Sequence, residues 1–206
     1  MTLIITNLTC GRGGRTVLTN VSFTLGQGQT LVLRGSNGIG KTTLLRTVAG
    51  LQPEQSGQIA APRDSLAYSG HADGIKPTLT VLENLAFWGA IFGASNLDPA
   101  LAAMNLRTLA DRPASTLSAG QKRRLGLARL LVTGRSIWLL DEPTVSLDGA
   151  STALFAAMIA DHLGQGGSAL IASHVDLGIA AAMPFDLAPF AAGATAQFSA
   201  FDEVLE

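Results

Sequence analysis

Charged residues and cysteine are both scarce in this chain. Only 14% of its 206 residues are Asp, Glu, Lys or Arg, and their near balance leaves a net charge of −1. Because proteins that grip nucleic-acid phosphates carry a basic excess, we expect no nucleic acid as a partner. The single cysteine, Cys10, permits no intrachain disulfide and no cysteine cluster for a metal. We expect it to be a small apolar residue of the interior.

Long apolar runs are missing as well. The first residues, MTLIITNLT, contain neither a basic segment nor a long apolar one, so no secretory signal is indicated. The most apolar late stretch, residues 179–190, is interrupted by Pro184, Asp186 and Pro189 and is too short to span a bilayer. A role at a membrane therefore has to come through another subunit. The hydrophobic content of 47% is high enough to exclude disorder and to leave apolar surface for such a partner.

What the chain does contain is a glycine-rich turn between a strand and a helix. Residues 35–42 are GSNGIGKT and match the phosphate-loop pattern G-x-x-x-x-G-K-[ST] without a mismatch. The preceding run, residues 30–33, is typical of a strand, and the glycines let backbone N–H groups turn inward around an anion. A helix that begins near Lys41 adds the positive end of its dipole. The turn predicts a binding site for nucleotide phosphates.

The residue types of this loop predict its contacts. We expect Lys41 to reach the β and γ phosphates and the Thr42 hydroxyl to ligate the accompanying Mg²⁺. Thr43 is placed to touch the α phosphate. The residues that form the cradle are Gly35, Ser36, Asn37, Gly38 and Gly40.

The remaining pattern predicts an α/β fold with an insertion. β-rich runs at residues 3–8 and 17–25, separated by glycine-containing turns, predict short antiparallel strands. Apolar residues then recur at helical spacing, which predicts a mainly helical lobe over about residues 72–130. Strand-like runs return in IWLLDEP and in SALIASH. Because strands alternate with helices after the phosphate loop, we expect a largely parallel sheet within a single domain, residues 1–206.

Two local predictions concern the segment after the phosphate loop. The helix that begins at Lys41 is expected to end at Gly50, since glycine favours a helix end and Pro53 follows shortly after. Residues 55–57 are expected to form a turn toward another pair of strands.

An acidic pair follows the apolar run at residues 137–140. A carboxylate at the carboxyl end of a central strand, beside a phosphate loop, is where a nucleotide-bound Mg²⁺ is held. We expect Asp141 to bind the metal through its water shell and Glu142 to polarise the water that attacks the γ phosphate. By itself, the pair could equally mark the start of a helix with Pro143 in its first turn.

The segment LSAGQ, residues 117–121, favours the first interpretation. Ser118 and the N–H groups around Gly120 form a second anion cup at a helix start. Lying between GSNGIGKT and IWLLDE, this segment resembles the signature sequence of ATP-binding-cassette (ABC) ATPases, with the motifs in the family's order. Residues 146–148, SLD, resemble the D-loop, and His174 resembles the switch histidine that contacts the γ phosphate. The resemblance covers about residues 3–176.

This resemblance implies a P-loop NTPase fold of ABC type, with an antiparallel β subdomain and an inserted helical lobe, that hydrolyses ATP. It also implies a pair of chains that enclose two ATP molecules head to tail. Lys41 of one chain and the partner's Ser118 and Gly120 would hold each γ phosphate, with Glu142 and His174 as catalytic residues. Hydrolysis would remove the charge that links the halves, and the opening of the dimer would drive an attached machine.

Two positions depart from the family pattern. Arg12 occupies the place of the aromatic residue that usually stacks on adenine, and no aromatic lies within residues 8–18. Adenine would be held by the plane of Arg12 or by Val17, unless Arg12 is a solvated loop charge. His71 occupies the place of the Q-loop glutamine, which reaches Mg²⁺. It would ligate the metal through water or act only as a spacer.

Both departures, with GIKPTLTVLENLAFW at residues 74–88 and LARL after the signature, resemble one subgroup. It comprises the ATP-binding subunits of cytochrome c-type biogenesis complexes, also described as heme exporter ATP-binding subunits. The resemblance implies a cassette that is peripheral on the cytoplasmic face of the bacterial inner membrane and pairs with separate integral membrane subunits. Heme export, or release of a heme carrier, is implied by the resemblance alone, since no residue here argues for contact with heme.

The apolar segment at residues 71–92 lies where ABC cassettes receive their membrane partners, although it could equally be the core of the helical lobe. The candidates for such a groove are Ile75, Leu79, Leu85, Phe87 and Trp88.

Other functions remain open at this point, including the ATPase of another small-substrate exporter and a soluble ABC protein of DNA repair or translation. Lys41 and Ser118 are 77 positions apart, which leaves no room for the long coiled coil of repair clamps. A single cassette of neutral charge argues against translation. Glu142 argues against a regulatory module without turnover.

Overall fold

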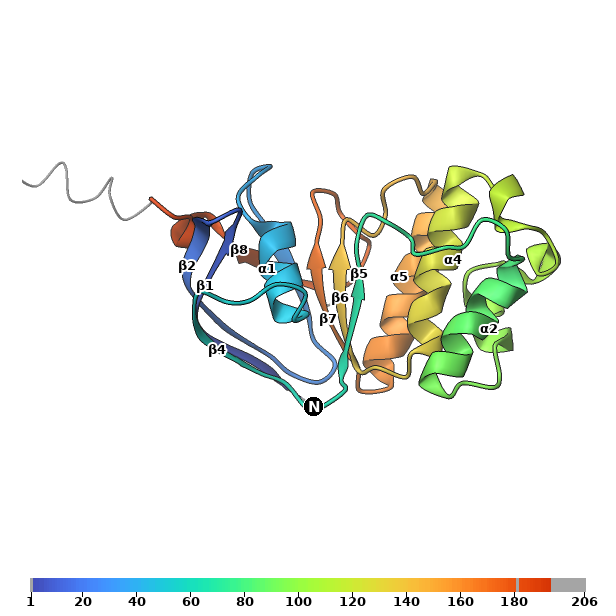
Figure 1. Cartoon of the computed structure of the whole chain (residues 1–206), viewed down its shortest axis with the longest axis horizontal. Helices are drawn as coiled ribbons and strands as arrows, with labels where there is room; N and C mark the ends of the chain where they lie inside the picture. The colour runs from blue at the N-terminus through green and yellow to red at the C-terminus, as the bar shows by residue number, and fades with distance from the viewer. Residues whose placement is uncertain (1, 181, 194–206) are drawn as a thin grey trace, which may run out of the picture.

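The computed structural model describes residues 2–180 and 182–193, which form two sheets and a helical lobe (Figure 1). From left to right in Figure 1, the molecule consists of a small antiparallel sheet, helix α1 (Lys41–Val48), a larger parallel sheet, and a group of helices. The predicted architecture, an α/β fold with an antiparallel β subdomain and an inserted helical lobe, is confirmed. The helical elements after α1 are α2 (Val81–Phe92), α3 (Asp98–Ala103), α4 (Ala119–Val132), α5 (Gly149–Gly164) and the 3₁₀ turns η1 (Arg107–Leu109), η2 (Ala114–Thr116) and η3 (Ala188–Phe190).

The antiparallel sheet has the order β2-β1-β4. Its strands are β1 (Leu3–Arg12), β2 (Arg15–Leu25) and β4 (Ser56–Ala60). Gly13 and Gly14 join β1 to β2 with φ angles of 57° and 78°. Two positive φ angles in a two-residue hairpin match the right-handed twist of the strands, which explains why both positions are glycine. Arg12 and Arg15 face each other across this turn.

The parallel sheet has the order β5-β6-β7-β3-β8, and every pairing in it is parallel. Its strands are β3 (Thr30–Arg34), β5 (Leu66–Ser69), β6 (Ile137–Asp141), β7 (Ser168–Ala172) and β8 (Ala182–Asp186). Every residue of β6 and of β7 is buried. Such strands are covered on both faces, which is why their sequences are continuous apolar runs rather than alternating ones.

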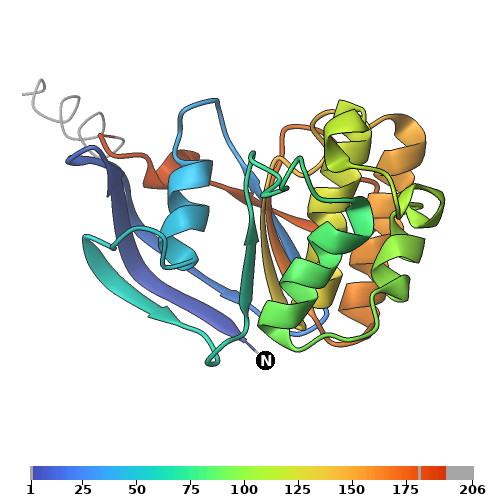
Figure 2. The ribbon, with the colours of Figure 1, turned by 45° about the vertical axis from the view of Figure 1, so that its right-hand side comes forward.

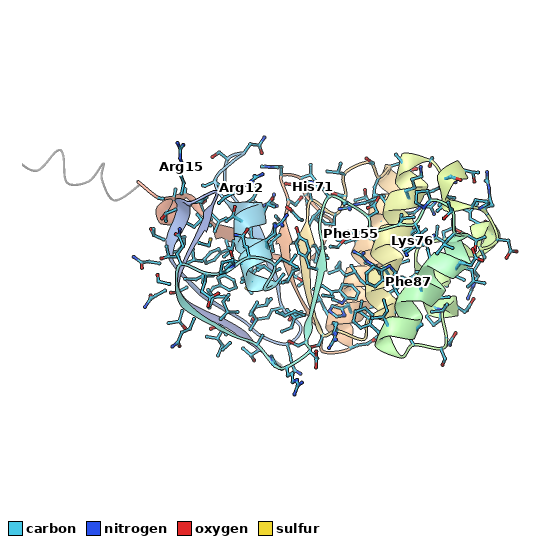
Figure 3. All side chains as sticks on the ribbon, viewed as in Figure 1. Arg12, Arg15, His71, Lys76, Phe87 and Phe155 are labelled. Atoms are coloured by element: carbon cyan, nitrogen blue, oxygen red, sulfur yellow. The ribbon has the colours of Figure 1, made fainter. Side chains whose placement is uncertain are left out.

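The two faces of this sheet support two cores. Alternate side chains of a strand point to opposite faces. Accordingly Leu139 of β6 packs in the core that contains α1 and the antiparallel sheet, whereas Trp138 packs in the core shared with the helical lobe. Phe155 of α5 is fully buried in this second core, between the parallel sheet and the helices in Figure 3. Figure 2 shows α1 enclosed between the two sheets. Both surfaces of the parallel sheet are therefore fixed, and its carboxyl edge is a rigid platform.

Local sequence signals delimit the helices well. Helix α1 ends at Val48, and Gly50 follows with a φ of 70°, as predicted. Helix α2 begins with a capping box in which Thr80 and Glu83 bond each other's backbone N–H groups at 3.1 and 2.7 Å. No helix within residues 2–180 and 182–193 has the length and apolar character needed to cross a membrane.

The predicted turn at residues 55–57 is wrong. Strand β4 already begins at Ser56, and Gly57 lies inside it with a φ of 92°. A Cβ at Gly57 would lie 2.4 Å from the carbonyl oxygen of Asn7 in β1, where the register between the two strands shifts. The glycine therefore allows a close approach of two backbones at a bulge, rather than a reversal of the chain.

Candidate nucleotide site

The phosphate loop leaves the start of helix α1 free of side-chain caps. Gly40 precedes the helix, and no side chain bonds its first N–H groups. The φ angles of Gly35, Gly38 and Gly40 are 137°, 83° and 120°, a range that favours glycine. A Cβ at Gly40 would also lie 2.7 Å from the side chain of Val17. The backbone donors of α1 thus remain available for an anion, as the sequence predicts for this loop.

Lys41 folds back over the loop that precedes it. Its Nζ donates hydrogen bonds to the carbonyl oxygens of Gly35 at 2.8 Å and Ser36 at 3.2 Å. Only 8% of the residue is exposed, and burial lowers the pKa of Lys41 while the carboxylates of Glu142 and Asp141 act in the opposite direction. The ammonium group is therefore held at the mouth of the loop by weak carbonyl acceptors that a phosphate oxygen would outcompete.

A cavity of about 560 Å³ opens in front of this loop. The side chains around it come from the carboxyl ends of neighbouring parallel strands: His71 follows β5, Asp141 and Glu142 end β6, and His174 follows β7. The phosphate loop itself follows β3, the next strand in the sheet. Figure 3 places His71 and Arg12 at this same end of the molecule. The lining residues are Arg12, Val17, Asn37, Gly38, Gly40, Lys41, Thr42, Thr43, His71, Asp141, Glu142, Val145, His174 and Val175.

The two carboxylates carry oxygens without partners. Oδ2 of Asp141 and Oε1 of Glu142 are buried and accept no hydrogen bond within the described part of the chain. Nε2 of His71 lies 3.7 Å from the first, and Nε2 of His174 lies 3.3 Å from the second. Buried carboxylate oxygens are costly unless a cation or water satisfies them. With the Thr42 hydroxyl, Asp141 supplies the hard oxygen donors that suit Mg²⁺.

Protein side chains alone would not complete a metal site here. No group of three or more His, Cys, Asp or Glu residues that could hold a metal ion occurs among residues 2–180 and 182–193. Mg²⁺ is usually bound by one or two protein oxygens together with substrate phosphates and water. The donors present therefore fit an ion that arrives with a nucleotide.

The signature segment lies outside this cavity. Ser118 is the N-cap of α4, where its Oγ accepts from Gln121 N at 3.2 Å and its own N–H donates to Gln121 Oε1 at 2.9 Å. Neither Ser118 nor Gly120 is among the residues that line the phosphate-loop cavity. A Cβ at Gly120 would lie 3.0 Å from the carbonyl oxygen of Ser146, so the signature packs against the D-loop of its own chain. The structure does not bring the two anion cups of one chain together.

The D-loop is shaped by backbone geometry and a helix cap. Ser146 has a φ of 69°, and Asp148 caps α5 by accepting from Ser151 N at 2.8 Å. Hydrogen bonding to the side chain of Ser151, and then to its backbone N–H, lowers the pKa of the exposed Asp148 carboxyl. The cap explains why an acidic residue stands at the start of α5.

Both residues that the sequence predicts to contact adenine lie at the cavity. Arg12 is exposed at the end of β1, and Val17 is half-buried on β2, and both line the cavity. Arg15 lies opposite Arg12 in the hairpin. Adenine contact by either residue stays a prediction.

One residue of this site was missed from the sequence. Arg123, on α4, is buried, and its guanidinium reaches the backbone of both the acidic pair and the segment before His71. The signal that could have found it is helical spacing, since Arg123 shares the face of α4 that buries Leu127 and Leu130. A charge on an apolar helix face requires a specific partner.

Known proteins resemble this chain along most of its length. The model of the ABC transporter family matches residues 18–145. A relative from Cereibacter sphaeroides, named cytochrome c biogenesis ATP-binding export protein CcmA, is 64% identical over 93% of this chain and 91% of its own. The protein of the same name from Paracoccus denitrificans is 64% identical over 92% of this chain and 90% of its own.

A solved structure shares the fold. It is a putative ABC transporter ATP-binding protein from Pyrococcus furiosus, with a TM-score of 0.83, 25% sequence identity, and coverage of 93% of this chain and 100% of its own. The arrangement of two sheets around α1, with a helical lobe beyond, is thus found in a second sequence that has diverged widely.

Proposed function

From the premise that this chain belongs to the ABC transporter family and is an ATPase, we propose that it powers a membrane complex for cytochrome c-type biogenesis. The observation that supports this most strongly is 64% identity over 93% of the chain to a protein named for that process. We further propose that the complex exports heme or releases a heme carrier. Residues 1–206 would form one ABC ATPase domain.

The geometry of the cavity supports specific roles in ATP binding and hydrolysis for the residues that line it. ATP would bind with its phosphates over residues 35–43, and Lys41 would exchange its carbonyl acceptors for phosphate oxygens. Thr42 and Asp141 would hold Mg²⁺, which neutralises charge on the phosphates when bound. Glu142 would accept a proton from the attacking water, with His174 beside it at 3.3 Å to contact the γ phosphate.

The position of the signature supports a paired unit. Ser118 lies on the exposed start of α4, outside the cavity that contains Lys41. A second chain packed head to tail would bring the partner's Ser118 and the partner's Gly120 over the γ phosphate. Each of the two ATP molecules would then be enclosed by one phosphate loop and one signature. A single chain would bind ATP and hydrolyse it poorly.

Helix α2 supports a site for the membrane subunits. Phe87 and Ile91 are 39% and 56% exposed on it, and Lys76 Nζ lies 4.5 Å from the centre of the Phe87 ring. Figure 3 labels Lys76 and Phe87 close together on the helical side of the molecule. Leu85, in contrast, is fully buried in the lobe's own core and is not available to a partner, so of the predicted groove residues Leu85 is excluded and Phe87 stays a candidate. Through such contacts the chain would be peripheral on the cytoplasmic face of the inner membrane, without nucleic acid as a partner.

Disrupting the phosphate loop in the source cell tests the process. We expect Lys41→Ala to abolish c-type cytochromes and to leave b-type cytochromes intact, because ATP would no longer drive the complex. The measurement is haem staining of c-type cytochromes together with difference spectra of both types. Arg63→Ala, at a side chain that is 96% exposed, is the matched control and leaves both types unchanged. Normal c-type staining in the Lys41 variant would reject the proposed process, and the membrane proteins that co-purify would then identify the correct one.

A further inference from the structure

Arg123 lies buried where three segments of the molecule meet. Only 4% of the residue is exposed. An arginine has five N–H donors in a fixed plane, and the guanidinium of Arg123 makes five hydrogen bonds of 2.9 to 3.3 Å. The acceptors are the carbonyl oxygens of Gly70, Asp141, Glu142 and Pro143 and the carboxylate of Asp73.

The acceptors belong to separate loops. Residues 70 and 73 follow β5, whereas Asp141 is the last residue of β6 and residues 142 and 143 follow it. Arg123 itself belongs to α4, the helix that begins with the signature. The approach is close, because a Cβ at Gly126 on the same helix would lie 2.9 Å from the Asp73 side chain. One planar group therefore joins the helical lobe to both loops at the carboxyl edge of the parallel sheet.

Four of the five acceptors are neutral backbone carbonyls, so the main effect of this contact is not to neutralise the charge of Arg123. Asp73 is the one carboxylate within 4.0 Å of the guanidinium among the described residues, and its side chain is 23% exposed. Burying a charge against neutral carbonyls costs desolvation energy that an apolar side chain would not cost. What the arginine supplies in return is fixed geometry between the segments.

The backbone of Glu142 depends on this geometry. Its φ is 47°, a conformation that residues other than glycine rarely adopt. Its N–H donates to Ala172 O on β7 at 2.9 Å, and its carbonyl accepts from Nη2 of Arg123 at 2.9 Å. The Glu142 backbone is thus fixed from the sheet on one side and from α4 on the other. Its carboxylate then enters the cavity beside His174.

We propose that Arg123 is a positioning residue for ATP hydrolysis, which acts by holding the backbone of Glu142 so that its carboxylate meets the attacking water. The inference rests on the proposed role of Glu142 as the base. Because α4 also carries Ser118, a shift of the signature helix would move Glu142 of the same chain through Arg123. In a head-to-tail pair, this contact would link the two ATP sites.

Arg123→Lys tests the inference in the full chain, purified with its membrane subunits. A lysine ammonium presents its donors from one point and cannot span carbonyls on both loops. We expect kcat to fall about tenfold or more while KM for ATP changes less than about threefold, since the position of the Glu142 carboxylate affects the transition state of hydrolysis rather than the binding of ATP. Arg124→Lys is the matched control. The acceptors of Arg124, the carbonyl oxygens of Met104 and Asn105, are adjacent and lie within the helical lobe. Its kcat stays within about twofold of the wild type.

Placing Arg123→Lys in the Glu142→Gln variant distinguishes a positioning role of Arg123 from a general loss of structure. In Glu142→Gln, single-turnover hydrolysis is slow, and adding Arg123→Lys is expected to slow it less than about twofold, because residues that act through one another are not additive. A further tenfold loss there would overturn the inference. So would a wild-type kcat for Arg123→Lys in an otherwise normal Glu142 background. Full turnover by Glu142→Gln alone would instead reject the proposed base, a result distinguishable from both.

Discussion

The starts of helices α1 and α4 are both predicted anion sites, yet they are built in opposite ways. At α1 the donors are uncapped, glycines shape the turn, and Lys41 is buried across it. At α4 the side chains of Ser118 and Gln121 form a complete capping box on an exposed edge. On the proposed function, the first would accept a nucleotide from solution, and the second would be a rigid surface that completes the site of a second chain. The difference in local capping is what the proposed division of one active site between two chains would require.

The largest effect on ATP turnover is expected from a change at Glu142, which lines the cavity at the start of α1 and is proposed to act in hydrolysis but not in ATP binding. Glu142→Gln removes the proton acceptor and keeps the size of the side chain, so turnover falls by at least about a hundredfold. ATP binding stays, because the phosphate loop is untouched. Paired chains then accumulate in ATP, visible as a shift on a sizing column. The matched control is Glu83→Gln, at the exposed start of α2, with normal turnover. Retained turnover in Glu142→Gln would remove the base assignment.

A mixing experiment tests whether α1 and α4 of one chain serve different sites. Lys41→Ala chains and Ser118→Arg chains are each expected to be inactive alone. In a mixed pair both faults fall in the same site, and the other site combines an intact Lys41 with the partner's intact Ser118. Random pairing of equal amounts then restores roughly a quarter of the wild-type rate, because half of the pairs have one sound site of two.

The outcome of mixing discriminates between two architectures. If each chain used its own signature, every site in the mixture would be faulty and no activity would return. Mixing Lys41→Ala chains with Glu142→Gln chains is the control, which tests whether the mixing of any two inactive variants restores activity. Both faults then lie on the phosphate-loop side, so each of the two sites in a mixed pair carries one of them and the mixture stays inactive.

Comparison of the sequence with the structure shows which features are encoded locally. The phosphate loop, the acidic pair and the signature occupy short segments in which glycine, strand and helix signals coincide, and the structure brings all but the signature to one cavity. The parallel sheet followed from alternating strands and helices. Arg123 could not be assigned in this way, because its acceptors are 18 to 53 positions away and four of the five are backbone carbonyls, which have no sequence signal.

Two other features depend on long-range packing. Gly57 looks like a turn residue, but the neighbour that requires it is Asn7, on another strand. Strand β8, which contains Pro184, pairs with β3 and is the edge strand of the parallel sheet within the described residues, and proline is tolerated at such an edge. Local chemistry thus predicted the ligand-binding turns, and pairing between distant segments decided the rest.

The smallest expected effect is on the free energy of unfolding, after changes at the starts of α1 and α4. Gly40→Ala places a Cβ at a φ of 120° and 2.7 Å from Val17, so we expect the free energy of unfolding to fall by about 2 to 3 kcal/mol. Ser118→Ala removes only a side-chain cap and costs about 1 kcal/mol. Gly149→Ala is the control, because it lies in open space at the start of α5 and is neutral or slightly stabilising. Urea unfolding measures all three variants. Equal losses at Gly40 and Ser118 would mean that the two helix starts are held by the same kind of interaction, because glycine geometry should cost more to disturb than a solvent-exposed cap.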